Sequence, residues 1–154
     1  MIDPKQAGQQ AEELFYKGYN CCESVITMMA EAFGKRCPEC IPALGTGMGG
    51  GVGHTGHVCG AVTGGAMAIG LASTLKKLKD HGAEKQWAIA LATELVDAFE
   101  REFSSVECGT LLGMDLRAAD AAERYRAGRC KEKCGHFVNF VGEWLARRLA
   151  EENL

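Results

Sequence analysis

Several features that would place this chain in a familiar class are missing from its sequence. No long uninterrupted hydrophobic run is present, because the most apolar window, residues 58–75, is broken by glycine and threonine and runs into Lys76 and Lys77. Such a window is too broken for a membrane span. The net charge is −3, and Lys and Arg are spread along the chain. Without a basic stripe, we expect neither nucleic acid nor a membrane as a partner.

The beginning of the sequence also lacks the signs of export. It reads Met-Ile-Asp-Pro-Lys-Gln, with no apolar segment and no twin arginine. We therefore expect a cytoplasmic protein. In a reducing cytoplasm, the eight cysteines of this chain are more often metal ligands, redox-active groups or inert core residues than structural disulfides.

No alternating β-strand pattern of useful length appears, and apolar residues recur instead at helical spacing. The clearest case is Trp87, Leu91, Leu95, Phe99 and Phe103, which follow one another at steps of four and predict an amphipathic helix. The 154 residues, 47% of them hydrophobic, suffice for one domain with its own core. We predict an all-α, single-domain bundle, residues 1–154, of about five to six helices with a long glycine-rich loop.

Capping signals and breaks place the expected elements along the chain. Asp3 with Pro4 begins the first helix, and Asn20 with Glu23 forms a capping box for the second. Two prolines and many glycines predict a loop without regular structure over residues 35–57. Later helices are expected over residues 59–79, after the break at residues 81–82, over residues 116–126 and over residues 134–152, with a short helical turn after Cys108.

Four cysteines fall where a helix is expected to begin, on four segments that are far apart in the sequence: Cys21, Cys59, Cys108 and Cys134. Free N–H groups and the positive end of the dipole at a helix start favour thiolate over thiol. Four thiolates can bind a [2Fe–2S] or [4Fe–4S] cluster or a tetrahedral zinc ion. Common zinc motifs use two close cysteine pairs, so this wide spacing favours a cluster, although buried free cysteines can also be simple core residues.

The glycine-rich run ends inside the helix expected from Cys59. Glycine at this density lets the backbone pass close to another group, and we take Gly49, Gly50, Gly51, Gly60 and Gly64 as candidate cofactor-binding positions. Close helix packing is the alternative for the last two. Nucleotide binding is disfavoured, because no strand precedes the run and no Lys-Ser or Lys-Thr follows it.

Further candidates lie beside these residues. Cys37 and Cys40 form a Cys-x-x-Cys pair that could cycle between dithiol and disulfide, or be an incidental exposed pair. His54 and His57 precede Cys59 and are weaker candidates for metal ligation or proton transfer.

The spaced motifs resemble one known family. They are Asn20-Cys21 at a helix start, Cys59-Gly-Ala-Val-Thr-Gly64 after the glycine-rich run, Cys108 followed by Leu112-Gly113-x-Asp115-Leu116, and Cys134 opening the last helix. Together they resemble the C_GCAxxG_C_C family of redox-active proteins over most of the chain. The resemblance implies a small helical prokaryotic domain whose four characteristic cysteines hold an iron–sulfur cluster or another redox centre. Cys22 and Cys130 lie near two of these cysteines, so the ligand in each pair is assigned by motif position alone.

A similar domain occurs in split-Soret cytochromes, which carry haem. This chain has no Cys-x-x-Cys-His, so covalent haem is not expected.

The leading hypothesis is an electron-transfer protein that holds an iron–sulfur cluster through its four cysteines and exchanges electrons with a redox partner protein. A metal-free thiol–disulfide oxidoreductase and a structural zinc protein are the alternatives. Whether the chain catalyses a reaction is left open by its sequence, and a homodimer is a weak expectation.

Overall fold

The computed structural model describes residues 2–34 and 40–154, and over these residues the chain is helical and contains no β-strand. The all-α class is therefore confirmed. The expected five to six helices are too few, since the described residues form eight α-helices and one 3₁₀ turn, η2. These elements are α1 (Pro4–Tyr16), α2 (Cys21–Phe33), α3 (Ile41–Gly45), η2 (Thr46–Met48), α4 (Gly60–Lys76), α5 (His81–Phe103), α6 (Cys108–Leu112), α7 (Ala121–Ala127) and α8 (Cys130–Glu151).

The differences from expectation lie mainly in the short elements. Residues 41–48 were expected to be irregular, but Pro42 stands in the first turn of α3, where a proline costs no hydrogen bond. The helix expected over 116–126 begins later, at Ala121. Before it, the Asp115 side chain accepts a hydrogen bond from the Arg117 N–H, and such a turn competes with helix.

The caps of the first two helices agree with the sequence. Asp3 accepts a hydrogen bond from the Gln6 N–H in front of α1. At α2, the Glu23 N–H donates to the Asn20 side chain at 2.9 Å, and the Asn20 N–H donates to the Glu23 carboxylate at 2.8 Å. Both halves of the predicted capping box are present.

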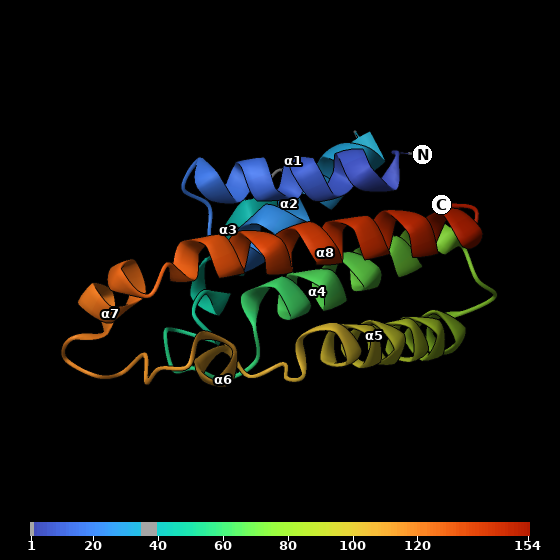
Figure 1. Ribbon diagram of the computed structural model, residues 1–154. Helices are drawn as coiled ribbons and strands as arrows, with labels where there is room; N and C mark the ends of the chain where they lie inside the picture. The colour runs from blue at the N-terminus through green and yellow to red at the C-terminus, as the bar shows by residue number, and fades with distance from the viewer. Residues whose placement is uncertain (1, 35–39) are drawn as a thin grey trace.

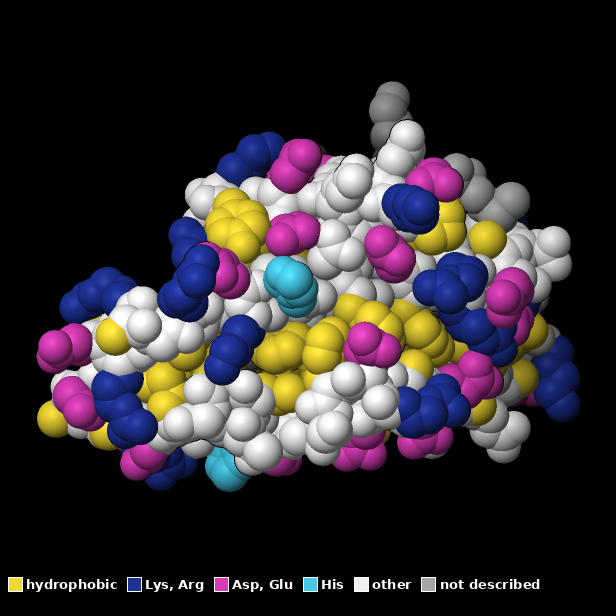
Figure 2. Space-filling model, in the orientation of Figure 1, with side chains coloured by type: hydrophobic (Ala, Val, Ile, Leu, Met, Phe, Trp, Pro, Cys, Tyr) yellow, Lys and Arg dark blue, Asp and Glu magenta, His cyan; other side chains and the backbone are white. Residues whose placement is uncertain are grey.

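The last helix, α8, lies between α1 and α4, and α5 packs on the opposite side of α4 (Figure 1). The core between these helices includes fully buried Met28, Ile69, Leu95, Phe99 and Leu145. The predicted stripe of α5 thus points into the core, with its outer aromatics Trp87 and Phe103 half-buried. An apolar band remains visible on the surface between α8 and α5 (Figure 2). Phe103 of α5 and Phe140 of α8 are half-buried, with their ring centroids 5.2 Å apart.

Two glycines allow α2 and α4 to cross closely. A Cβ atom on Gly64 would lie 2.8 Å from the Cys22 carbonyl oxygen, and one on Gly60 would lie 3.0 Å from the Cys21 Cβ. The crossing brings the start of α4 against the start of α2. Close packing is therefore a role that both glycines perform.

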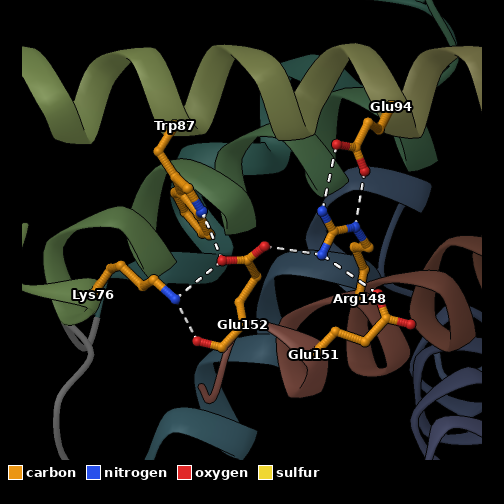
Figure 3. A network of polar contacts seen from close by, with 6 residues as sticks. All are labelled: Lys76, Trp87, Glu94, Arg148, Glu151 and Glu152. Atoms are coloured by element: carbon orange, nitrogen blue, oxygen red, sulfur yellow. Dashed lines mark hydrogen bonds and ion pairs between the residues drawn. The ribbon is translucent and has the colours of Figure 1, made fainter.

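The two ends of the bundle differ in composition. Polar contacts join the ends of α4 and α8 to α5 (Figure 3). The Glu152 carboxylate is bound by the Lys76 ammonium at 3.0 Å, the Trp87 ring N–H at 3.1 Å and the Arg148 guanidinium at 3.0 Å, measured from nitrogen to oxygen. The starts of α2, α4 and α8 lie at the other end, with α6 and α7 (Figure 1). None of the described helices is long and apolar enough to cross a membrane.

Candidate redox site

The four cysteines singled out by the sequence meet in one cavity. Cys21, Cys59, Cys108 and Cys134 all line a cavity of about 600 Å³. They come from four different elements at the same end of the bundle. Cys59, Cys108 and Cys134 are buried, and Cys21 is half-buried.

A single antiparallel bridge between Val58 and Glu107 aligns two of these segments. The Cys59 N–H donates to the Val106 carbonyl at 2.8 Å, and the Cys108 N–H donates to the His57 carbonyl at 2.6 Å. The bridge thus holds the start of α4 beside the start of α6. It brings together two cysteines that are far apart in the sequence.

Three of the four cysteines stand at helix starts, as predicted. Cys21 is the first residue of α2, Cys108 is the first residue of α6, and Cys59 is the N-cap of α4. Cys134 does not open its helix, because α8 begins one turn earlier, at Cys130. Arg129, the residue before Cys130, has a left-handed φ of 53° and makes no side-chain capping bond. The sequence therefore carries no capping signal for the start of α8.

The thiols of Cys21 and Cys134 interact directly, and this sets their charge. The pKa of Cys134 is lowered because the Cys21 thiol donates a hydrogen bond to its sulfur, and the Tyr125 hydroxyl adds a second. The same contact, together with burial, raises the pKa of Cys21 well above its ordinary value. Of this pair, Cys134 is therefore the thiol that loses its proton more easily.

The other two cysteines of the cavity are neutral thiols when no metal is bound. Burial raises the pKa of Cys59 to about 12 and that of Cys108 to about 11. Burying a thiolate costs free energy unless a cation or donor stabilises it. A bound metal would supply that cation for both.

Cys22 and Cys130, the neighbours of two motif cysteines, lie outside the cavity wall. The Cys22 side chain is buried with Ile26 and Ile41 in a separate apolar cluster, with its Sγ 3.6 Å from the Met67 Sδ. Cys130 is buried in the core of the bundle and does not line the cavity. Of each pair, the structure thus places the motif residue in the wall.

The glycine-rich segment contributes backbone to the same cavity. Gly49, Gly50 and Gly60 line it, as does His54. Residues 50–54 have five consecutive φ values between 59° and 69°, a left-handed turn that is rare for L-residues. A Cβ on Gly51 would lie 2.5 Å from the backbone of His57. Only glycine at this position lets the two backbone segments approach so closely.

The remaining predicted residues lie elsewhere. Gly64 packs on Cys22 within the helix crossing, and the ring of His57 is exposed, 3.9 Å from the Glu107 carboxylate. Cys40 is exposed in front of α3. Its sequence partner, Cys37, lies outside the described residues.

Sequence reasoning missed a group of residues on α7 and in the segment before it. Tyr125 and Arg126 line the cavity, together with apolar residues between 111 and 122. The single aromatic residue of α7, among alanine, glutamate and arginine, was the one available signal. Its hydroxyl contact with Cys134 depends on how α7 folds back on α8.

The donor set can be compared with the groups that it could hold. Within residues 2–34 and 40–154, no three Cys, His, Asp or Glu side chains are arranged to hold a single metal ion. The ligands of an iron–sulfur cluster are Cys thiolates. Thiolates are also the ligands of structural zinc. Four thiols around one cavity therefore offer the donor set that either group uses.

The sequence was also compared with known proteins. The sequence model of one family, described as "Putative redox-active protein (C_GCAxxG_C_C)", matches residues 19–148. The matched range contains all four cavity cysteines. No curated protein and no solved structure shows significant similarity to the chain.

Proposed function

The chain belongs to the C_GCAxxG_C_C family of redox-active proteins, and from that premise we propose that its four cavity cysteines hold an iron–sulfur cluster for electron transfer. The observation that carries the proposal is the convergence of Cys21, Cys59, Cys108 and Cys134 on one cavity from four separate segments. Chance placement of buried cysteines would not require a common cavity. When bound, such a cluster accepts and returns single electrons.

The residues at this site would have three different roles. The four thiols are the ligands, and each would give up its proton on binding. Tyr125 donates a hydrogen bond to the Cys134 sulfur, which would raise the reduction potential by stabilising the added electron. Phe15, Leu112 and Phe137 line the cavity with apolar surface and keep water away from the sulfurs.

Anaerobic purification followed by a visible spectrum and by iron, sulfide and zinc analysis tests the proposal. We expect a coloured protein with iron and acid-labile sulfide in equal amounts. A colourless protein that contains neither, even after anaerobic reconstitution with iron and sulfide, would overturn it. Stoichiometric zinc without iron would select a structural zinc site instead.

The contact between Cys21 and Cys134 favours a second candidate function, thiol–disulfide exchange. The Cys134 thiolate would attack a disulfide of an oxidised partner protein and release one partner sulfur as a thiolate. Cys21 would then lose its proton and attack the Cys134 sulfur, forming an intramolecular disulfide and releasing the partner as a dithiol. Two electrons pass to the partner in this exchange, with one proton from Cys21 and a second proton from water.

Peptide mapping of metal-free protein distinguishes this candidate. After treatment with an oxidised dithiol, a disulfide between Cys21 and Cys134 that dithiothreitol reverses would support it. An unchanged number of free thiols in oxidant and in reductant would exclude it.

A further inference from the structure

The cavity continues well beyond the four thiols. Its outer wall is built from α6, the segment after it and α7, and includes Met114, Leu116, Ala118, Ala122, Tyr125 and Arg126. The volume of the whole cavity, about 600 Å³, falls within the range of small-molecule sites, roughly 300–1,000 Å³. We call the part bordered by the outer wall the apolar chamber.

Small side chains create the space in the apolar chamber. Ala118, Ala119, Ala121 and Ala122 all border it, and alanine at these positions leaves room where a larger apolar residue would fill the wall. Residues 113–120 form no helix, and Gly113 ends α6 with a left-handed φ of 67°. This part of the wall is therefore a loop with small side chains and not a packed helix.

One charged side chain borders this chamber among the described residues that line it. Arg126 is exposed, and its guanidinium forms no ion pair with the described part of the chain. A guanidinium presents paired donors that match a carboxylate.

We propose that the apolar chamber binds a flat, mostly apolar organic molecule that carries a single acidic group, with the ring towards the cysteines and the acidic group at Arg126. Apolar walls with few polar groups select ring systems by burial and leave orientation to the polar contact. The order of the two ends follows from the position of Arg126 in the outer wall, where its guanidinium can meet the carboxylate. The role of this molecule as a redox substrate rests on the proposed function, but its binding requires no metal.

Calorimetric titration with 2-naphthoate tests the proposal on anaerobically purified protein. We expect saturable binding at one site, and at least tenfold weaker binding by Ala122→Trp, whose indole would fill the chamber. Ala90→Trp on the exposed side of α5 is the matched control and should bind like the wild type. If Ala122→Trp does not fold, as judged by circular dichroism, Ala118→Leu takes its place.

A second comparison tests the role of Arg126. Arg126→Gln should weaken 2-naphthoate binding about tenfold, since a hydrogen bond between charged groups contributes about 1.5 kcal/mol or more. Binding of 2-naphthol, which has the same rings and no carboxylate, should change little in this variant. Equal losses for both ligands would overturn the assigned orientation.

Absence of saturable 2-naphthoate binding, or equal binding by wild type and Ala122→Trp, would overturn the proposal. Iron and sulfide analysis of the same samples keeps this outcome separate from the proposed function. A sample that binds 2-naphthoate but contains no iron after reconstitution would contradict the cluster alone. A sample that contains the cluster but binds no 2-naphthoate would contradict the chamber alone.

Discussion

Val58 and Glu107 pair across a single antiparallel bridge, and the residue after each of them is a cysteine of the cavity. The pairing includes two backbone hydrogen bonds, of 2.8 Å and 2.6 Å, donated by Cys59 and Cys108 themselves. Backbone geometry, and not a side-chain contact, therefore sets the spacing of these two thiols. The same geometry would hold with or without a bound metal.

Replacing any one of the four cavity cysteines by serine should remove most of the iron from the purified protein. A hydroxyl is a harder and far less acidic ligand than a thiol, so it does not replace a thiolate in a cluster. Cys40→Ser, at an exposed cysteine outside the cavity, should keep the iron content of the wild type. Normal iron in all four cavity variants would rule out this ligand set.

The thiol of Cys134 should be alkylated by iodoacetamide at neutral pH faster than the thiols of Cys59 and Cys108 in reduced, metal-free protein. A lowered pKa means a larger thiolate fraction at pH 7 for Cys134, whereas pKa values of about 12 and about 11 keep the other two protonated. Mass spectrometry of timed samples gives the three rates.

Tyr125→Phe should slow the alkylation of Cys134, because it removes one of the two donors that stabilise the thiolate. Tyr19→Phe, at an exposed tyrosine, is the control and should leave the rate unchanged. If Tyr125→Phe leaves the rate as it is, the hydroxyl does not stabilise this thiolate.

Two glycine substitutions on α4 should have opposite effects on stability. Gly64→Ala places a Cβ 2.8 Å from the Cys22 carbonyl oxygen and 3.0 Å from its Cα, and backbone cannot move aside cheaply. We expect a loss of about 1–3 kcal/mol in the free energy of unfolding. Gly70→Ala meets no atom within 4 Å and should add about 0.5–1 kcal/mol through helix propensity. Urea denaturation of both variants checks the signs, and a stable Gly64→Ala would show that α2 and α4 can separate.

Glu152→Gln should destabilise the protein by about 1 kcal/mol at pH 7. Hydrogen bonds from Lys76 and Trp87 lower the pKa of Glu152 to about 2 (Figure 3). A lowered carboxyl pKa contributes stability that is fully present above the ordinary value of 4.5 and is lost as the pH falls towards 2.

The difference in unfolding free energy between wild type and Glu152→Gln should therefore shrink between pH 5 and pH 2. Glu151→Gln, at the neighbouring exposed carboxylate, should show a smaller difference at neutral pH. A gap between wild type and Glu152→Gln that stays constant over this range would show that the charge of Glu152 is not the cause.

Local signals in the sequence were sufficient for much of the fold. The capping box at Asn20 and the four-residue repeat from Leu91 to Phe99 both act within one or two helical turns, and both are present in the structure. The start of α8 at Cys130 was missed because Arg129 adopts a left-handed cap without a side-chain capping bond. The conformation of Arg129 depends on how α7 connects to α8, and no short sequence pattern predicts that connection.

At the candidate site too, some features follow from local sequence signals and others from tertiary packing. The spacing of the cysteines and the glycine-rich run identified the residues, because both are written in the sequence. The contact of Cys21 with Cys134 and the apolar chamber arise from tertiary packing between elements far apart in the chain. Tyr125 belongs to this second class, since its partner Cys134 lies on another helix.

During synthesis on the ribosome, the first three cavity cysteines emerge long before Cys134, which lies on α8. That helix also fills the space between α1 and α4 (Figure 1), so the nascent chain lacks both the fourth thiol and a central part of its core until α8 has been made. An incomplete chain offers scattered thiols with no common cavity. The common cavity therefore exists only once α8 is in place, and any group that needs all four thiols would be held only by a chain that includes this helix.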